Sequence, residues 1–485
     1  MANVLWLTLA AVATAVFAFA TLAAPAILGP IVLLVALVAA IILARKRLGV
    51  RNLAAVPDPP GYAWELVLLP LAVSVRQHII ITLGLIAICF LIAVVRRGGE
   101  NSRAAILPVA LLALAAAVSV RTSVGLLALL VAVLAVIFVS RTKTSVQLAV
   151  KSLTAGLAVY LIANTVGQIA GIASPASAVR IGGFASSGVF GERFLFPFAR
   201  SINEPTIVFA AFIVMVAARW MLKNRPTALH VFGVVAGIYI VLGSNSRVPA
   251  VLAVILTLAV LAVPATSSKV LPVAVPVAMA APFFLAALQP ALMWVAGLVV
   301  NIPYLARGQN VIQIVELGTR GPIWQGALTF WWTEAGTTGK LLGYGPNGHA
   351  TSGANLYYLA GQDKFLNDST ALTTHNSFLQ TLLDGGLLSL GLLAVALTVT
   401  LFRFARTSET LPQLLAVSAI GLCGVMEVVV APAATTTPSY LLLILAAFVP
   451  TAKRAERQPQ TADSSAEYSL QSPTARACSA TRTRV

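Results

Sequence analysis

The side chain best suited to proton chemistry is His375, in the sequence Thr373-Thr374-His375-Asn376-Ser377. Histidine exchanges protons near neutral pH and often serves as a general base. The sequence holds four histidines, and this one stands where a polar stretch turns into a long apolar run. Asn376 or Thr374 can cap the helix that the run predicts. Taken alone, His375 is more simply interpreted as a helix-capping or interfacial residue.

Arginines at the edges of other apolar runs suit the binding of an anion. Arg247 directly precedes an apolar run, and Arg320 precedes an amphipathic stretch that contains Trp324. The segment before the run at 205–222 carries three more, namely Arg180, Arg193 and Arg200. A planar guanidinium group matches phosphate oxygens in a way that lysine does not. Arginines and a histidine together suit a phosphate-bearing leaving group and an acceptor hydroxyl, although Arg247 could also be an interfacial anchor and Arg320 a solvated surface residue.

Two further features accompany these residues. Gly343, Gly345 and Pro346 predict a tight turn in which the backbone can approach a ligand or another segment closely. Asp384 and Glu427 are ionisable residues inside apolar runs, so we expect both to face the helix bundle or a cavity. For Asp384 we expect a structural or supporting role rather than catalysis.

The elements that position these residues must be membrane helices. The 485 residues are 59% hydrophobic and 10% charged, with a mean hydropathy of +0.92, whereas soluble chains carry about 25% charged residues. Apolar runs of about 20 residues recur, and strand-like alternation is absent. The net charge of +17 is spread over short loops and the tail, which is typical of topology signals rather than of nucleic-acid binding. Three cysteines in no paired motif indicate neither a disulfide framework nor a metal site.

The runs predict an all-α, polytopic helical bundle of about 12–14 transmembrane helices with a large late extracytoplasmic loop. They fall near 4–23, 26–44, 61–75, 79–95, 104–120, 123–140, 152–172, 205–222, 229–243, 249–264, 271–300, 376–402, 411–431 and 436–450. If successive loops between these runs lie on opposite sides of the membrane, sixteen lysines and arginines fall on one side and three fall in the short loops of the other side. The positive-inside rule makes the first side cytoplasmic, with both termini inside.

This topology divides the chain into three regions. Residues 1–172 form amino-terminal transmembrane helices, and 173–450 form a membrane region with outer loops at 173–204 and 301–375. Residues 451–485 are polar and of low complexity, which predicts a disordered cytoplasmic tail. His375, Arg247 and Arg320 then all lie at the outer face.

Four motifs in order resemble the O-antigen ligase and O-antigen polymerase family. His375-Asn376 is followed, after nine residues, by Gly386-Leu387-Leu388 and the small residue Ser389. The family pattern also includes Ser246-Arg247, Arg320 with Trp324, and Gly343-Tyr344-Gly345-Pro346, and the similarity covers roughly 180–393. The family often has glycine where Ser389 stands, and Gly385 is an additional glycine after Asp384. The segment 200–206 matches only loosely, at Asn203.

The resemblance implies a metal-independent glycosyltransferase of cell-envelope polysaccharide assembly, without a cofactor, in a bacterial plasma membrane. Its donor would be a glycan on a polyprenyl diphosphate such as undecaprenyl diphosphate, and its acceptor a glycan or glycolipid. Arg247 and Arg320 would bind the diphosphate, and His375 would orient or deprotonate the acceptor hydroxyl. Supporting positions would be Arg193, Arg200, Gly345, Asn376 and Asp384.

Two other functions remain as alternatives. A transporter or flippase of a lipid-linked or anionic solute would use the arginines to line a path, but few polar residues stand near mid-span beyond Asp384 and Glu427. A metal-dependent polyprenyl glycosyltransferase would need an acidic pair in the first outer loop, which here lacks a carboxylate. Within the leading hypothesis, polymerase and ligase both remain open because they differ only in the acceptor.

Overall fold

The structure is a computed structural model. It describes residues 58–74, 88–89, 92, 102–122, 133, 144–174, 194–199, 201–222, 224–244, 246–262, 264–301, 310–315, 320–359, 373–432 and 436–448. All regular elements in these ranges are helices, which confirms the all-α prediction for this part of the chain. The predicted spans at 4–23 and 26–44, nearly all of the span at 123–140, most of the span at 79–95, and the tail at 451–485 lie outside the described residues.

Among the described residues, three helices are long and apolar enough to cross a membrane, namely α7 (Val146–Ile169), α8 (Glu204–Met221) and α19 (Ser377–Phe404). Other helices fall at further predicted spans: α3 (Trp64–Ser74), α5 (Ser102–Val120), α9 (Ala228–Ser244), α10 (Arg247–Ala262), α20 (Leu411–Cys423) and α21 (Thr437–Ala447). The number of spans and their sidedness stay predictions.

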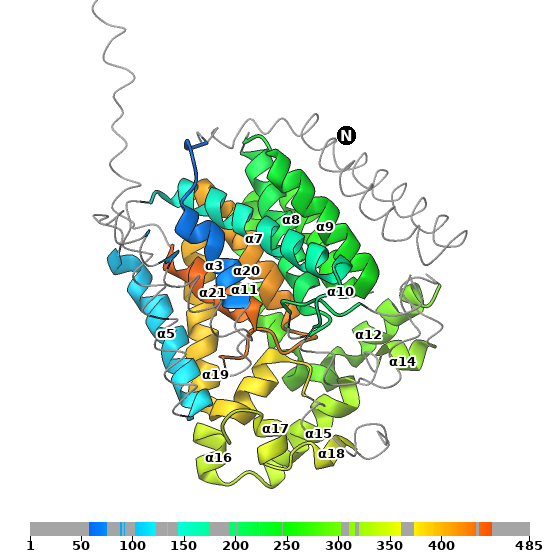
Figure 1. Ribbon diagram of the computed structural model, residues 1–485. Coiled ribbons are helices and arrows are strands. Elements are labelled where there is room, and N and C mark those ends of the chain that lie inside the picture. Colours follow the sequence, from blue (N-terminus) through cyan, green and yellow to red (C-terminus); the bar gives the residue numbers. More distant parts are fainter. Residues whose placement is uncertain are drawn as a thin grey trace, which may run out of the picture. The chain divides into compact units, whose positions relative to one another are not determined.

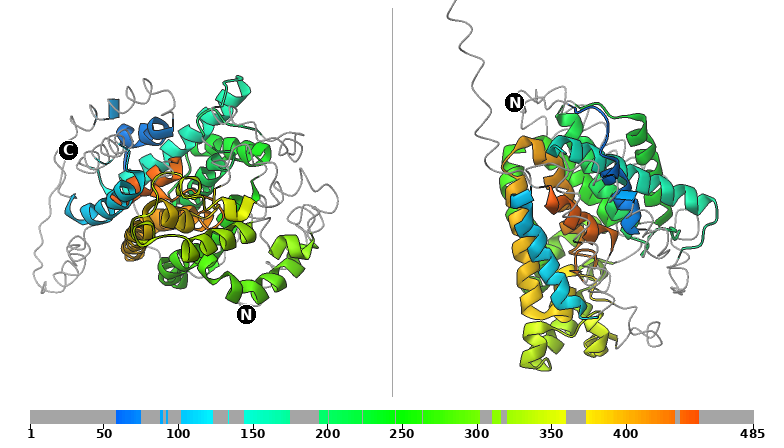
Figure 2. Two further views of the ribbon diagram at one scale, coloured as in Figure 1. Left: turned by 90° about the horizontal axis from the view of Figure 1, so that it is seen from below. Right: turned by 60° about the vertical axis from the view of Figure 1, so that its left-hand side comes forward.

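The bundle packs through close helix pairs (Figures 1 and 2). α5 lies along α19, α8 packs against α20, and α7 packs against both α3 and α9. Glycines allow some of these approaches, since a Cβ on Gly237 of α9 would enter the ring of Phe209 on α8. Large apolar side chains nevertheless face outward from several helices, including Phe232, Leu114 and Val395. Such exposure suits a lipid environment better than water.

Two basic residues at one end of the bundle share one carboxylate. Arg219, in the last turn of α8, lies 2.9 Å from the Asp58 carboxylate, and Lys151, in the second turn of α7, lies 3.6 Å from it. Arg219 also contacts the ring of His230 in α9. Lys151 and Arg219 therefore lie together, as their predicted placement on one side of the bundle requires.

Two predicted spans differ from the structure. The single run expected at 271–300 is divided into α11 (Pro264–Met279), a 3₁₀ turn η3 (Ala281–Phe284) and α12 (Leu285–Val299). Pro282 stands within the 3₁₀ turn, where its missing N–H and fixed φ oppose a continuous helix. The run expected at 411–431 ends as a helix at Cys423, so Glu427 lies in a non-helical segment beyond it.

The stretch predicted as a long outer loop, 301–375, contains helices of its own. They are α14 (Val311–Val315), α15 (Arg320–Thr333), α16 (Thr337–Leu342), α17 (Gly348–Thr351) and α18 (Leu356–Leu359). A separate apolar cluster, which includes Trp324, Phe330 and Tyr358, packs α15 and α18 against Leu379 and Leu383 of α19. Figure 1 shows α15 to α18 gathered at the end of the bundle where α19 begins.

α19 is interrupted at Gly386, which has φ 65° and ψ −167°. This left-handed backbone divides the helix into a first part, 377–385, and a second part, 387–404. The break leaves backbone carbonyls of the first part available as acceptors. The turn that contains Gly343, Gly345 and Pro346, here called the glycine turn, donates hydrogen bonds to them. Tyr344 N donates to Leu383 O at 2.8 Å, and Gly345 N donates to Asp384 O at 2.8 Å. Asp384 therefore lies at the break, and not deep inside one continuous span as its sequence position suggested.

Replacing Gly386 by alanine tests this break. A Cβ there would collide with the backbone of Leu341 and would strain the left-handed conformation, which costs about 1–3 kcal/mol for non-glycine residues. We expect Gly386→Ala to lower the thermal unfolding midpoint in detergent, as measured by tryptophan fluorescence. Gly391→Ala is the matched control, because a Cβ on this glycine of the same helix meets nothing within 4 Å. Equal midpoints for the two variants would contradict the proposed constraint.

Candidate functional site

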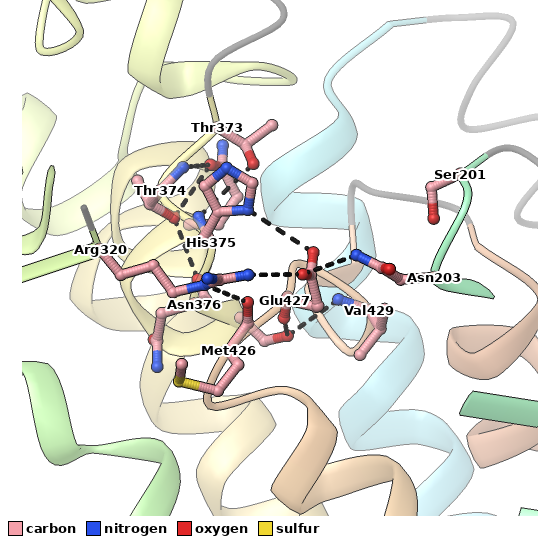
Figure 3. Close-up of polar contacts among 12 residues, drawn as sticks. Ser201, Asn203, Arg320, Thr373, Thr374, His375, Asn376, Met426, Glu427 and Val429 are labelled. Atoms are coloured by element: carbon pink, nitrogen blue, oxygen red, sulfur yellow. Dashed lines mark hydrogen bonds and ion pairs between the residues drawn. The ribbon is translucent and has the colours of Figure 1, made fainter. Parts of the chain in front are cut away.

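The candidate site is built around the carboxylate of Glu427 (Figure 3). The guanidinium Nη2 of Arg320 lies 2.9 Å from Oε1, and the amide of Asn203 donates to the same oxygen at 2.8 Å. The ring Nδ1 of His375 lies 3.5 Å from Oε2. Arg320 begins α15, Asn203 precedes α8, His375 precedes α19, and Glu427 follows α20. Four segments far apart in the sequence therefore meet at one carboxylate.

The cluster is partly open rather than sealed. The side chains of Arg320, Glu427 and His375 are 24%, 19% and 30% exposed. Partial exposure lowers the desolvation cost of a charged pair and leaves the group accessible to a ligand. Within the part of the chain that the structure describes, no cluster of three or more histidine, cysteine or acidic residues could hold a metal ion.

Two contacts from α15 position the arginine and the histidine together. The Nε of Arg320 donates to Met426 O at 3.0 Å, which holds the guanidinium against the Glu427 segment. One helical turn later, the indole of Trp324 donates to Thr374 O at 2.9 Å. Residues four apart on a helix share a face. One face of α15 therefore contacts both the segment that carries Glu427 and the segment that carries His375.

The start of α19 is fixed by Asn376. Its side-chain oxygen accepts from Leu379 N at 2.8 Å, and its amide donates to Met279 O and Val425 O at 3.1 and 3.0 Å. Asn376 is therefore the N-cap, one of the two caps expected from the sequence. His375 directly before it has φ 50°, a conformation that is unfavourable for a non-glycine residue and recurs at functional sites.

Ser377 fixes the segment that carries Glu427. Its hydroxyl donates to Glu427 O at 2.8 Å and accepts from Val429 N and Val430 N, both at 3.0 Å. Its own backbone N–H donates to Gly424 O at 2.8 Å. The first turn of α19 thus holds the non-helical segment 424–430 in place, and with it the position of the carboxylate relative to His375.

Within the described part of the chain, Asp384 does not contact the Glu427 cluster directly but supports the helix that follows His375. Its carboxylate accepts from Gly348 N at 2.7 Å and from the amide of Gln380 at 2.8 Å. The same amide lies 3.0 Å from Nδ1 of the buried His349. These contacts attach the glycine turn, with Gly345, to the part of α19 that follows His375. They give Asp384 structural hydrogen bonds and His349 a buried contact, and the supporting role of Asp384 in the site stays a prediction.

The remaining predicted site residues are only partly described. The backbone of Arg247 begins α10, and its side chain is outside the description. Arg193 and Arg200 lie outside the described residues. The structure thus brings together His375, Asn376 and Arg320, and it adds Glu427 and Asn203, which sequence reasoning did not place at the site. The available signal for Glu427 was its charge within an apolar run.

The surroundings of Glu427 favour its ionised form. Burial alone would raise the pKa of this carboxyl, but its interactions with His375 and Arg320 hold the pKa below its usual value. A lowered pKa in the folded state stabilises the fold above the pKa of the unfolded chain, and this stabilisation is lost as the pH falls through the folded-state pKa. The cluster should therefore be intact at neutral pH and weaken on acidification.

A comparison of wild type with Glu427→Gln across pH checks this electrostatic role. We expect wild type to unfold at a higher temperature at pH 7, because the amide cannot pair with the guanidinium as a charge. The difference should shrink as the pH falls below about 4.3, the usual value for a glutamic acid. A difference that stays constant over this range would contradict it, and Glu409→Gln serves as a control outside the site.

The chain matches no family model, no curated protein and no solved structure. The function of the chain therefore has to be inferred from the residues of the site and from the motif resemblance in the sequence.

Proposed function

We propose that this chain is a membrane glycosyltransferase that resembles O-antigen ligases and polymerases. It would transfer a glycan from a polyprenyl diphosphate donor to a hydroxyl of a glycan or glycolipid acceptor at the outer face of a bacterial plasma membrane. One observation carries the proposal. Arg320 and His375, selected from the sequence as a diphosphate ligand and a base, meet at the single carboxylate of Glu427. They do so at the start of a helix that is apolar enough to cross a membrane.

The Glu427–His375 pair supports base catalysis. A carboxylate facing Nδ1 favours the tautomer that carries its proton on Nδ1, which leaves a lone pair on Nε2. Among the described residues, Nδ1 has no hydrogen-bond partner and lies 3.5 Å from the carboxylate. Such catalytic contacts are often long before substrate binds. The carboxylate would then stabilise the imidazolium that forms when Nε2 takes a proton.

The reaction would proceed as a displacement at the anomeric carbon. Nε2 of His375 accepts the proton of the acceptor hydroxyl, whose oxygen bonds to that carbon. The bond between the carbon and the diphosphate oxygen breaks, and the diphosphate leaves with the bonding electrons. The Arg320 guanidinium, held by Glu427 and Met426 O, stabilises the charge that develops on the leaving group.

Arg247 would supply a second guanidinium to the diphosphate. α10, which it begins, packs against α8, whose preceding residue Asn203 bonds to Glu427. Since α9 returns the chain between them, α8 and α10 begin at the same end of the bundle. This arrangement supports placing Arg247 on the side of the bundle where the cluster lies.

The direct test uses purified protein in liposomes that contain lipid-linked glycan extracted from the producing cells. We expect His375→Ala to lower glycan transfer by about 10²–10⁴-fold, the usual contribution of a general base. Arg320→Ala should also lower transfer, because it removes charge from the leaving group. Lys340→Ala, a basic residue of α16 outside the cluster, should retain activity.

Undiminished transfer in both His375→Ala and Arg320→Ala would refute the proposal. Movement of lipid-linked glycan across the liposome membrane without any new glycosidic bond would instead support the transporter alternative. The product distinguishes the two acceptor classes, since a polymerase lengthens the lipid-linked glycan and a ligase transfers it to a different acceptor.

A further inference from the structure

Gln380, in the first part of α19, connects two buried residues to the backbone beside His375. Its amide nitrogen donates to Asp384 Oδ1 at 2.8 Å and lies 3.0 Å from Nδ1 of His349. Its amide oxygen accepts from the backbone N–H of Thr374 at 3.4 Å and lies 3.2 Å from the Thr374 hydroxyl. Gln380 and these three partners are each at most 3% exposed. The network therefore extends to Thr374, the residue directly before His375.

The partners of the Gln380 amide allow only one of its two orientations. Oδ1 of Asp384 is an acceptor, because it also accepts from Gly348 N, whereas the backbone N–H of Thr374 is a donor. A turned amide would set its oxygen against Oδ1 and its nitrogen against that N–H. Since an amide nitrogen only donates, Nδ1 of His349 accepts and its ring proton is on Nε2. Asp384 and His349 therefore orient the amide that holds Thr374.

Both backbone polar groups of Thr374 are held by side chains. The indole of Trp324 donates to Thr374 O at 2.9 Å, and Gln380 accepts from Thr374 N. On the other side of His375, the side chain of Asn376 makes three hydrogen bonds as the N-cap. His375, with φ 50°, therefore lies between two fixed residues. An unfavourable backbone conformation of this kind persists only where its surroundings impose it.

We propose that Gln380 is a positioning residue for His375, which holds the backbone before it so that Nδ1 of the ring faces Glu427. The inference rests on the proposed function, because it explains how the base is kept in place before substrate binds. Gln380 acts through Thr374 and not on the reacting atoms. Without the amide, the buried N–H of Thr374 would lose its acceptor and 373–375 would relax toward an ordinary backbone conformation. The ring would then move away from the carboxylate that orients it.

Gln380→Met tests this role, because methionine keeps the length and volume of the side chain and removes the amide. We expect kcat for glycan transfer to fall at least about tenfold, since misplacing a reacting group by about 1 Å costs up to about 10²-fold. KM for the lipid-linked donor should stay unchanged, because Arg320 keeps its contacts. Full kcat in Gln380→Met would overturn the proposal.

Thr400→Val is the matched control for Gln380→Met. It removes another buried hydrogen bond of α19, from Thr400 Oγ1 to Ala396 O at 2.7 Å, in the second part of the helix. We expect this variant to retain kcat. Thermal unfolding of both variants in detergent shows whether they fold. Equal losses of kcat in the two variants would show that any lost buried hydrogen bond of α19 has this effect, and would contradict a specific role of Gln380.

Gln380→Glu adds a pH profile that a purely structural role would not change. Among the described residues, the titratable groups bonded at this position are Asp384 on α19 and His349 on α17. The protonated carboxyl keeps an acceptor for Thr374 and a donor for Asp384, whereas the ionised one repels the Asp384 carboxylate. Transfer relative to wild type at the same pH should therefore fall as the pH rises, while Gln380→Met stays low throughout. A ratio for Gln380→Glu that does not depend on pH would refute the proposal.

Nitrogen NMR of isotopically labelled histidine separates this inference from the proposed function. The spectra are recorded on the full chain in detergent at mildly alkaline pH, and the His375 signals are those absent from His375→Ala. We expect the tautomer with its proton on Nδ1 in wild type and Thr400→Val, and a mixture of tautomers in Gln380→Met. That result without any transfer by wild type would support the positioning role and refute the glycosyltransferase proposal. Transfer by wild type, with kcat and the His375 signals unchanged in Gln380→Met, would refute the positioning role alone.

Discussion

The ion pair between Arg320 and Glu427 joins residues that are 107 positions apart in the chain, and the geometry of the site depends on it. A carboxylate in a mainly apolar bundle is stable only if donors satisfy it. Here the donors come from the start of α15 and the segment before α8, while His375 faces the second oxygen. Removing the carboxylate would leave a partly buried guanidinium without its counter-charge, and it would release His375 from its orienting partner.

The backbone of α19 provides the complementary constraint. Asn376 and Ser377 define where the helix begins and which way the 424–430 segment faces, and Gly386 ends its first part after nine residues. The first part therefore belongs with α15 to α18, and the second part belongs with α5 in the bundle. Asp384 connects the two by holding the glycine turn at the break. The hydrogen bonds of this short helix end hold the non-helical segment that carries Glu427, and so they support the site more rigidly than a free loop would.

The hydrophobic pattern and local sequence rules predicted much of the fold. The rest depends on long-range pairing, which such rules do not predict. Apolar runs predicted helices such as α7, α8 and α19, because burial of backbone polar groups in lipid or protein demands internal hydrogen bonds. Local rules also anticipated the Asn376 cap. The same rules failed at 271–300 and 411–431, where composition stays apolar while the helix stops. The partnership of Glu427 with Arg320 and His375 was beyond local pattern, since nothing in a single segment specifies which distant charge will face it.

The central claim is that Glu427 acts through His375, and a double-mutant cycle tests it most directly. Transfer rates from lipid-linked glycan are measured for wild type, His375→Ala, Glu427→Gln and the double variant, with each variant's unfolding temperature as a folding check. If the carboxylate orients the base, that part of its effect is absent once the imidazole is removed, so Glu427→Gln should slow transfer by a smaller factor in the His375→Ala background than in wild type. Losses that multiply, with the double variant slower than His375→Ala by the full factor of Glu427→Gln, would show that the two residues act independently and would contradict the account.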